Sequence, residues 1–233
     1  VCQAITGSGG WPMTIIMTPE QKPFFAGTYL PKSSKYGMTG LDDLLLKIAE
    51  LWQNDRKNLT ESAEKITAHF SRLSQNKTAG EIPSKELVFS GISALKQSFD
   101  NKNGGFGNAP KFPTPHNLLL MMKYSQTEND IEALQTVDAT LVQMFRGGIF
   151  DHIGGGFSRY STDEKWLVPH FEKMLYDNAL LTYAYTQAYQ ITGNKLYKTV
   201  AERTIGYVLR ELTYEEGGFF CGQDADSDGI EGK

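Results

Sequence analysis

A glycine pair followed by phenylalanine occurs three times in the second half of the chain, at 104–106, 155–157 and 217–219. The first two copies start 51 residues apart and the next two 62, and each copy follows a segment with helical periodicity. Paired glycines let a loop reverse tightly because they adopt positive φ at little steric cost. Spacings of this order are typical of an array of one supersecondary unit. The pattern therefore predicts a fold whose unit is a helix, a GGF loop and a second helix.

Helical periodicity fills most of the remaining second half. Ser84 is placed to cap a helix that runs to about Phe99. Further helices are predicted at 115–126, 130–146, 172–192 and 195–213. Short loops between such segments favour antiparallel neighbours. The second half is therefore expected to be an all-helical set of hairpins.

The first 73 residues show a different pattern. Residues 13–18 (MTIIMT) predict a short buried strand, because they are β-branched and apolar and have a proline on either side. Residues 24–29 predict the return strand, after a turn that contains two prolines. Residues 41–73 predict a helix with an apolar stripe. This part is therefore expected to have an α/β fold.

The stretch 74–84 (SQNKTAGEIPS) has no apolar period and many turn-forming residues, so it is the predicted linker. We therefore expect two domains, at 1–73 and 85–233. The chain begins at Val1 and ends just after an acidic loop. This favours a piece of a longer protein.

Charge and cysteine content limit the function. The chain has 23 basic and 27 acidic residues, a formal charge of −4, whereas a nucleic-acid-binding domain usually has a basic face. No apolar run approaches the roughly 20 residues of a membrane helix. Cys2 and Cys221 form neither a CxxC motif nor a disulfide framework, which favours a reducing compartment. We therefore expect a cytoplasmic protein that binds neither nucleic acid nor membranes.

Several long motifs resemble one protein family. The segments GGWP at 9–12 and GTYLP at 27–31 resemble part of the thioredoxin-like domain of the YyaL-type proteins, relatives of spermatogenesis-associated protein 20. The second half resembles the helical domain of that family through GGFGNAPKFPTPHNL, GGIFDHIGGGFSRYSTDEKWLVPHFEKMLYDNALL and GGFFCGQDADSDGIEGK. The resemblance covers nearly the whole chain.

This resemblance implies a mixed fold, in which the C-terminal part of a thioredoxin-like α/β domain precedes part of an (α/α)6 toroid of helical hairpins. Trp11-Pro12 is then expected where thioredoxin has its cis-proline, and a cysteine motif would precede Val1. The toroid group includes sugar-processing enzymes and epimerases. The chain would supply roughly five helices of the toroid, so its pocket would be open on one side.

The segment 151–178 concentrates ionisable and aromatic residues around a loop, as polar pockets do. On a helix starting near residue 170, His170 and Asp177 would share a stripe two turns long, and Glu172 would lie in its first turn. In one interpretation His170 is a general base and the two carboxylates complete an acid–base set. In the other, His170 and Glu172 only cap the helix and Asp177 bonds a nearby loop.

His152 lies in the second GGF loop. A loop histidine near a second histidine suits two-base epimerisation, in which one base removes a carbon-bound proton and the other returns one. The alternative is a hydrogen bond from His152 to the backbone of the turn.

Three neighbouring residues are candidates for substrate binding. Arg159 is suited to hold a carboxylate or phosphate with two hydrogen bonds, or else to pair with Asp163 or Glu164. The rings of Tyr160 and Trp166 are suited to stack on a sugar, although for Trp166 a place in the core is the first expectation.

An acidic stretch near the end of the chain, Asp224-x-Asp226-x-Asp228-Gly229, matches the opening of a calcium loop. Its flank is not helical, and the final glutamate of such a loop would lie beyond residue 233. We therefore predict no metal site, and a catalytic role for Asp224 or Asp226 as the carboxylate partner of a sugar. A solvated acidic loop is the other interpretation.

A proline and a histidine also open the helix predicted at 115–126. Thr114 is the expected N-cap and Pro115 the first helical residue. His116 would then face the same end as His170 and contact substrate, or serve only in local capping.

Two functions remain open from the sequence. One is a carbohydrate-active enzyme, a hydrolase or an epimerase, with a polar site at the mouth of the toroid and no cofactor. The other is a non-catalytic toroid that binds a sugar or a protein, joined to a thioredoxin-like redox or docking module. The oligomeric state is left open.

Overall fold

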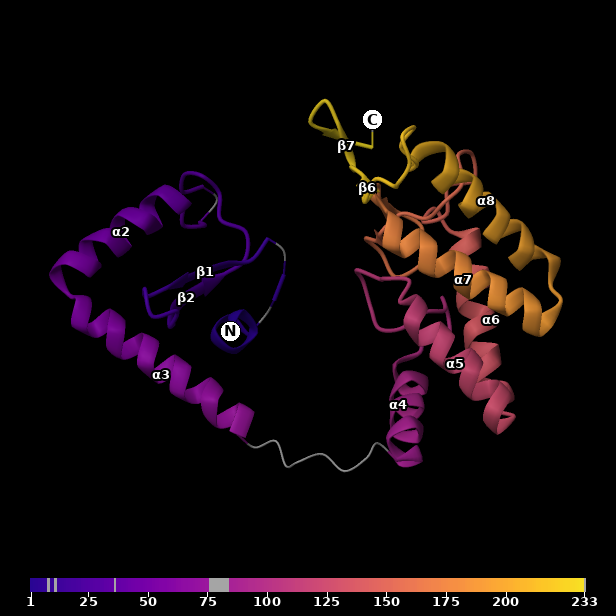
Figure 1. Ribbon diagram of the computed structural model, residues 1–233, viewed down its shortest axis with the longest axis horizontal. Helices are drawn as coiled ribbons and strands as arrows, with labels where there is room; N and C mark the ends of the chain where they lie inside the picture. Colours follow the sequence, from indigo (N-terminus) through magenta and orange to yellow (C-terminus); the bar gives the residue numbers. More distant parts are fainter. Residues whose placement is uncertain (8, 11, 36, 76–83, 233) are drawn as a thin grey trace. The chain divides into compact units, whose positions relative to one another are not determined.

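The computed structural model describes the chain except for residues 8, 11, 36, 76–83 and 233 (Figure 1). It contains two compact units, Val1–Pro83 and Ser84–Lys233, called unit 1 and unit 2 below. Most of the predicted linker at 74–84 lies outside the described residues, as does Trp11 of the proposed cis-proline position. Each unit is described by itself.

The described residues of unit 1 form a two-stranded antiparallel sheet and three helices. The strands β1 (Thr14–Met17) and β2 (Pro23–Gly27) pair where the sequence predicts a hairpin. The helices are α1 (Cys2–Thr6), α2 (Leu41–Asn54) and α3 (Arg56–Gln75).

The single helix predicted at 41–73 is wrong in one respect, because α2 ends and α3 begins around Asp55. This residue leaves the helical conformation at φ −144°. Its carboxylate accepts a hydrogen bond from the side-chain amide of Asn58, with a distance of 2.7 Å. Aspartate favours such local bonds over a helix interior.

Unit 2 is built from five helices in hairpin order, α4 (Lys85–Ser98), α5 (Pro115–Glu128), α6 (Ile131–Arg146), α7 (Leu175–Thr192) and α8 (Lys195–Glu211). Helix α5 packs against both α6 and α7, and α8 packs against α7 (Figure 1). The helices other than α7 lie within about two residues of their predicted bounds, which is the usual scatter of helix ends.

The start of α7 differs from the prediction. Two short strands, β4 (Pro169–His170) and β5 (Lys173–Met174), occupy residues expected to be helical. They pair with β3 (Tyr160–Ser161) and β6 (Gly222–Gln223), respectively. The backbone N–H and C=O groups of β4 and β5 thereby bond to other strands, so they are not available for helical hydrogen bonds. The predicted helical stripe joining His170 to Asp177 does not exist.

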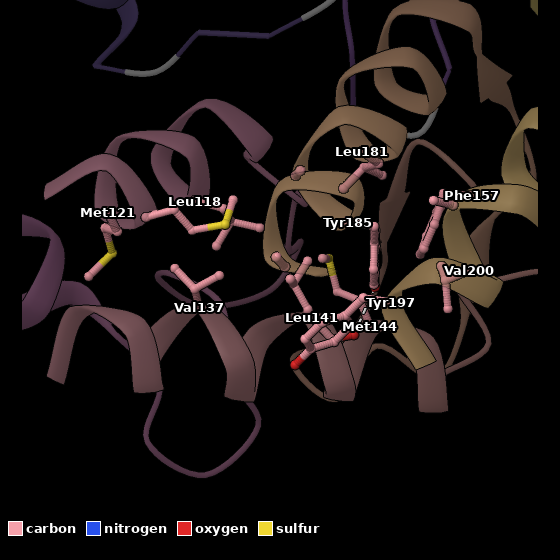
Figure 2. Close-up of a cluster of buried hydrophobic side chains, with 14 of the residues drawn as sticks. Leu118, Met121, Val137, Leu141, Met144, Phe157, Leu181, Tyr185, Tyr197 and Val200 are labelled. Atoms are coloured by element: carbon pink, nitrogen blue, oxygen red, sulfur yellow. Dashed lines mark hydrogen bonds between the residues drawn. The ribbon is translucent and has the colours of Figure 1, made fainter. Parts of the chain in front are cut away.

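The core of unit 2 lies between its helices (Figure 2). Leu118, Leu141 and Leu181 are fully buried, and burial of such a side chain stabilises a fold by about 1.5–3 kcal/mol. The buried Tyr185 donates a hydrogen bond to the carbonyl of Leu141, with a distance of 2.8 Å. This bond satisfies its polar end inside the apolar core.

The first two GGF loops have one construction. Phe99 pairs with Phe106, and Phe150 with Phe157, so that each loop closes on itself. The second glycine of each pair has φ near +80° and lies against an aromatic ring. A Cβ on Gly105 would be 2.4 Å from the Trp166 ring. These positions therefore need glycine for both conformation and space.

Candidate functional site

The second GGF loop and the start of α7 bring together an arginine and two carboxylates. The backbone N–H of Arg159 donates to the carbonyl of Glu172, with a distance of 2.7 Å. The guanidinium Nη1 of Arg159 donates to Oε2 of Glu172 at 2.8 Å. Both side chains are about two-thirds to three-quarters buried, so water screens this pair less than a surface ion pair. The backbone bond fixes the alignment of the pair.

Asp177 lies in the first turn of α7 and is only 9% exposed. Burial raises the pKa of its carboxyl to about 6; the charge of Arg159 lowers this value and that of Glu172 raises it. The first turn of a helix usually favours the ionised form of a carboxyl. Burial outweighs this effect here because Oδ2 of Asp177 has no hydrogen-bond partner among the described residues.

Three rings form a ladder beside this group. Tyr160 and His170 are cross-strand partners in β3 and β4, and their rings stack with centroids 4.8 Å apart. On the neighbouring segment, Lys111 pairs with Ser161, so Phe112 lies next to Tyr160 and their ring centroids are also 4.8 Å apart. Tyr160 is therefore the middle ring of a Phe112–Tyr160–His170 ladder.

His170 connects the ladder to the carboxylates. Its Nε2 lies 3.8 Å from Oε2 of Glu172, so a protonated imidazole would form an ion pair there. Glu172 therefore lies between two cationic or potentially cationic groups, Arg159 and His170.

The two carboxyls have opposite environments. Glu172 is bound by the guanidinium of Arg159, whereas burial favours the protonated form of Asp177. Environments that separate two carboxyls in this way are how enzymes assign one proton donor and one charged partner. The group can hold a proton near neutral pH at Asp177, beside the ion pair of Arg159 and Glu172.

Five predicted residues are thus brought to one place: Arg159, Tyr160, His170, Glu172 and Asp177. Arg159 pairs with Glu172 rather than with Asp163 or Glu164. Asp163 instead accepts backbone hydrogen bonds from Lys165, Leu167 and Val168. The sequence analysis did not predict Phe112 as a site residue. The available signal was its position between Lys111 and Pro113, in the loop that leads into α5.

His152 has different surroundings. Its ring contacts Phe145 and Phe150, with centroids 5.2 Å away in each case, and its Nε2 lies 3.3 Å from the carbonyl of Gly147. The backbone carbonyl of His152 accepts a bond from Arg203 at 2.6 Å. These contacts fit the backbone-bonded alternative, with Gly147 rather than the turn itself as partner.

The structure places Trp166 in the core. The ring is fully buried, and its Nε1 donates to the carbonyl of Asn103 at 3.0 Å. No face of this ring is open to a sugar. The ring instead packs against Gly105 of the first GGF loop.

His116 is exposed in the first turn of α5. Thr114 precedes the helix as expected, but its side chain makes no capping hydrogen bond and its φ is +42°. Thr114 therefore occupies the N-cap position of α5, but its side chain does not bond the free N–H groups of the first turn.

The acidic stretch near the end of the chain forms a β-hairpin. Asp226 pairs with Glu231 between β7 (Asp226–Ser227) and β8 (Ile230–Glu231), and Asp228 and Gly229 form the two-residue turn, both with positive φ. This is the Asp-Gly turn preferred in tight hairpins. No group of three or more potential metal ligands occurs in the described parts of the chain.

Asp224 and Asp226 are exposed. Gln223, the residue before Asp224, pairs with Lys173. Because Gln223 precedes Asp224 and Lys173 follows Glu172, this pairing brings the two segments side by side. Asp226 follows in the hairpin.

The first unit matches a family model. Residues 1–71 match Thioredox_DsbH, described as a protein of unknown function, DUF255. This supports the predicted thioredoxin-like character of the region. None of the described helices combines the length and apolar character needed to cross a membrane.

Curated relatives match both units. Human spermatogenesis-associated protein 20 is 40% identical in an alignment that covers 97% of this chain and 30% of the relative. The mouse protein of the same name is 39% identical over 97% of this chain and 29% of its own length. The chain thus spans about three tenths of the length of the curated relatives it matches.

Solved structures resemble the helical part. Cellobiose 2-epimerase from Bacillus thermoamylovorans B4167 matches with a TM-score of 0.51 and 18% identity, over 57% of this chain and 37% of the other. The unsaturated glucuronyl hydrolase specific for heparin matches with a TM-score of 0.51 and 16% identity, over 71% and 54%. At these identities the likeness shows the fold alone, a toroid of helical hairpins. Over 97% of its length the chain is similar in sequence to spermatogenesis-associated protein 20, of which it spans about three tenths.

Proposed function

We propose that the loop end of unit 2 binds a carbohydrate and performs acid–base chemistry on it, with Asp177 as the group that transfers the proton. The observation that carries this proposal is the buried carboxyl of Asp177, whose pKa is raised to about 6 and whose Oδ2 lacks a partner among the described residues. A group with a pKa near the working pH can both donate and accept a proton efficiently.

A hydrolase would use the two carboxyls. Protonated Asp177 would donate to the leaving oxygen of a glycosidic bond, and ionised Glu172 would stabilise the positive charge that develops on the sugar or activate a water. The contrast between a buried acid and a carboxylate bound to Arg159 supports this arrangement.

An epimerase would use Asp177 and His170 as two bases across one sugar carbon. His170 lies on the Glu172 side of the group, because its Nε2 is 3.8 Å from Oε2 of Glu172. His152, with its contacts to Phe145 and Gly147, is a weaker candidate for the second base. Fold likeness to a cellobiose 2-epimerase and to a hydrolase is compatible with either reaction.

The second candidate function is sugar binding without turnover. The exposed ring of Phe112 at the end of the ladder favours it, since an open aromatic face stacks on the apolar face of a sugar without any proton transfer. In that case the thioredoxin-like unit 1 would act as a redox or docking module. Unit 2 would then hold its ligand without changing it.

The test uses the 233-residue chain with cellobiose in deuterated water and, separately, with 4-nitrophenyl glycosides. Incorporation of deuterium at a ring carbon, seen by NMR, indicates an epimerase, and release of nitrophenol indicates a hydrolase. We expect Asp177→Asn to lower the observed rate by at least about a hundredfold. Glu202→Gln, on the exposed part of α8, should leave it unchanged.

Equal rates in Asp177→Asn and the unaltered chain would overturn the role of Asp177. Cellobiose binding without exchange or cleavage would favour the non-catalytic function. Circular dichroism of both variants shows whether a lost rate reflects a lost fold.

A further inference from the structure

We infer that Phe112 forms a second sugar-binding position, so that the ligand of this site is an oligosaccharide of at least two units rather than a monosaccharide. This inference rests on the carbohydrate function proposed above. It names the substrate class and a residue that selects it.

The first step is the position of Phe112 at the open end of the ring ladder. Tyr160 covers one side of its ring, at 4.8 Å between centroids and with 32° between the ring planes. The side chain nevertheless remains 43% exposed. A ring that is covered on one side by Tyr160 and is still this exposed has its other side open to solvent. Apolar surface of this kind is available to stack on a ligand.

The second step is the rigidity of the backbone that carries this ring. The N–H of Lys111 donates to the carbonyl of Ser161 at 2.8 Å, and the N–H of Ser161 donates back to Lys111 at 2.9 Å. The side chain of Lys111 is fully buried, with Nζ bonded to Asp100 and to the carbonyl of Gly104. Phe112 is therefore held in place before a ligand arrives, which lowers the entropy cost of binding.

The third step is the distance along the ladder. Two ring-to-ring spacings of 4.8 Å separate Phe112 from His170, which in turn lies beside Glu172. A sugar beside His170 and Glu172 is therefore not the sugar that stacks on the open side of Phe112. A second unit, joined to the first by a glycosidic bond, would extend the ligand along the ladder to Phe112.

Charge favours a neutral ligand over a phosphorylated one. Arg159 is paired with Glu172, and the buried Asp177 adds further negative charge when ionised. The described charged groups of this site therefore leave no excess positive charge for a phosphate. Sugar hydroxyls, which both donate and accept hydrogen bonds, suit such a group.

The experiment compares the affinities of D-glucose and cellobiose, measured by titration calorimetry on the full 233-residue chain. We expect Phe112→Ala to raise the Kd for cellobiose about three- to tenfold, the size of one aromatic contact, and to change the Kd for glucose less than about twofold. Phe112→Trp should keep the affinity for cellobiose. Phe89→Ala is the matched control, because Phe89 lies on α4, is 40% exposed and contacts one ring, that of Tyr124.

Three outcomes would overturn the inference: equal weakening of both sugars, no change with either sugar, or no binding of either sugar by the unaltered chain. A different outcome would overturn the proposed catalysis alone. If cellobiose binds in a Phe112-dependent way and Asp177→Asn changes no rate, the oligosaccharide site stands without the acid–base role.

Discussion

Asp151 and Lys173 are joined by an ion pair of 2.7 Å in the second GGF loop, and Lys173 also donates to the carbonyl of Gly155. The first loop repeats this arrangement, with a 2.6 Å pair between Lys111 and Asp100. In both loops the aspartate side chain also accepts backbone N–H bonds within the turn. In each loop, one lysine from the segment that follows binds both the aspartate and a glycine carbonyl of the loop. The two clamps hold the segments from which the candidate site is built.

Removing the buried lysine of the first clamp should strongly destabilise unit 2. Burial raises the pKa of Asp100, but hydrogen bonds from Lys111 and Asn103 outweigh it and hold that pKa well below its ordinary range. Lys111→Met would leave this carboxylate without its partner, at a cost of about 3–5 kcal/mol. Urea unfolding should show this loss at pH 7.

Controls for that experiment come from the same unit. Lys123→Met, on the exposed side of α5, should change stability by less than about 0.5 kcal/mol. Asp100→Asn added to Lys111→Met should recover part of the loss, because it removes the unpaired charge. A depressed carboxyl pKa stabilises the fold above about pH 4, so the loss should shrink as pH falls below that value. A loss that does not depend on pH would contradict the clamp.

Asp177 should make the fold less stable at neutral pH than at mildly acidic pH. Its folded pKa, raised to about 6 by burial, exceeds the ordinary value of 3.8, so the folded state binds more protons than the unfolded state between these values. Stability therefore falls as pH rises from about 4 to 6. Asp177→Asn should be more stable than the unaltered chain at pH 7.5 by about 1–2 kcal/mol, and equal to it near pH 4. Thermal unfolding at both pH values measures the difference, and a constant difference would refute it.

The neighbours of Asp177 should shift its pKa in opposite directions. Arg159→Gln removes a positive charge that favours the ionised form, so the pKa of Asp177 should rise further. Glu172→Gln removes a negative charge, so that pKa should fall. The carboxyl carbon of Asp177, followed by NMR against pH, reports both values. Shifts of the same sign would mean that the three groups are not arranged as described.

Two glycines of the first loop allow a matched test of its packing. Gly105 and Gly107 have φ of +79° and +73°, so an alanine at either one is strained by about 1–2 kcal/mol. A Cβ on Gly105 would also meet the Trp166 ring at 2.4 Å, whereas one on Gly107 would meet nothing within 4 Å. Gly105→Ala should therefore cost at least about 1 kcal/mol more than Gly107→Ala in urea unfolding. Similar costs would show that Trp166 does not hold the loop.

Local pattern was sufficient for the hairpins of unit 2. Helix α6, predicted at 130–146, begins at Ile131 after Asp130, whose side chain accepts a hydrogen bond from Ala133. The GGF loops follow the helices as expected. The segment 151–178 was predicted to concentrate ionisable residues around a loop, and in the structure Arg159 pairs with Glu172 there and acts on the pKa of Asp177.

The errors arise where partners are distant in sequence. The helix predicted at 172–192 begins only at Leu175, because β5 pairs with β6, and Lys173 faces Gln223 some fifty residues later. Helix periodicity and motif spacing contain no information on which segment supplies the pairing strand.

The sequence by itself determined the helical hairpins, the reversals at the glycine pairs and the segment in which polar residues gather. These depend on backbone conformation and on contacts a few residues apart, which residue types control directly. The tertiary structure alone decided that Phe112 joins Tyr160 and His170, and that Asp177 is buried. Burial and ring stacking depend on neighbours brought in by long-range pairing, and burial is what raises the pKa of Asp177.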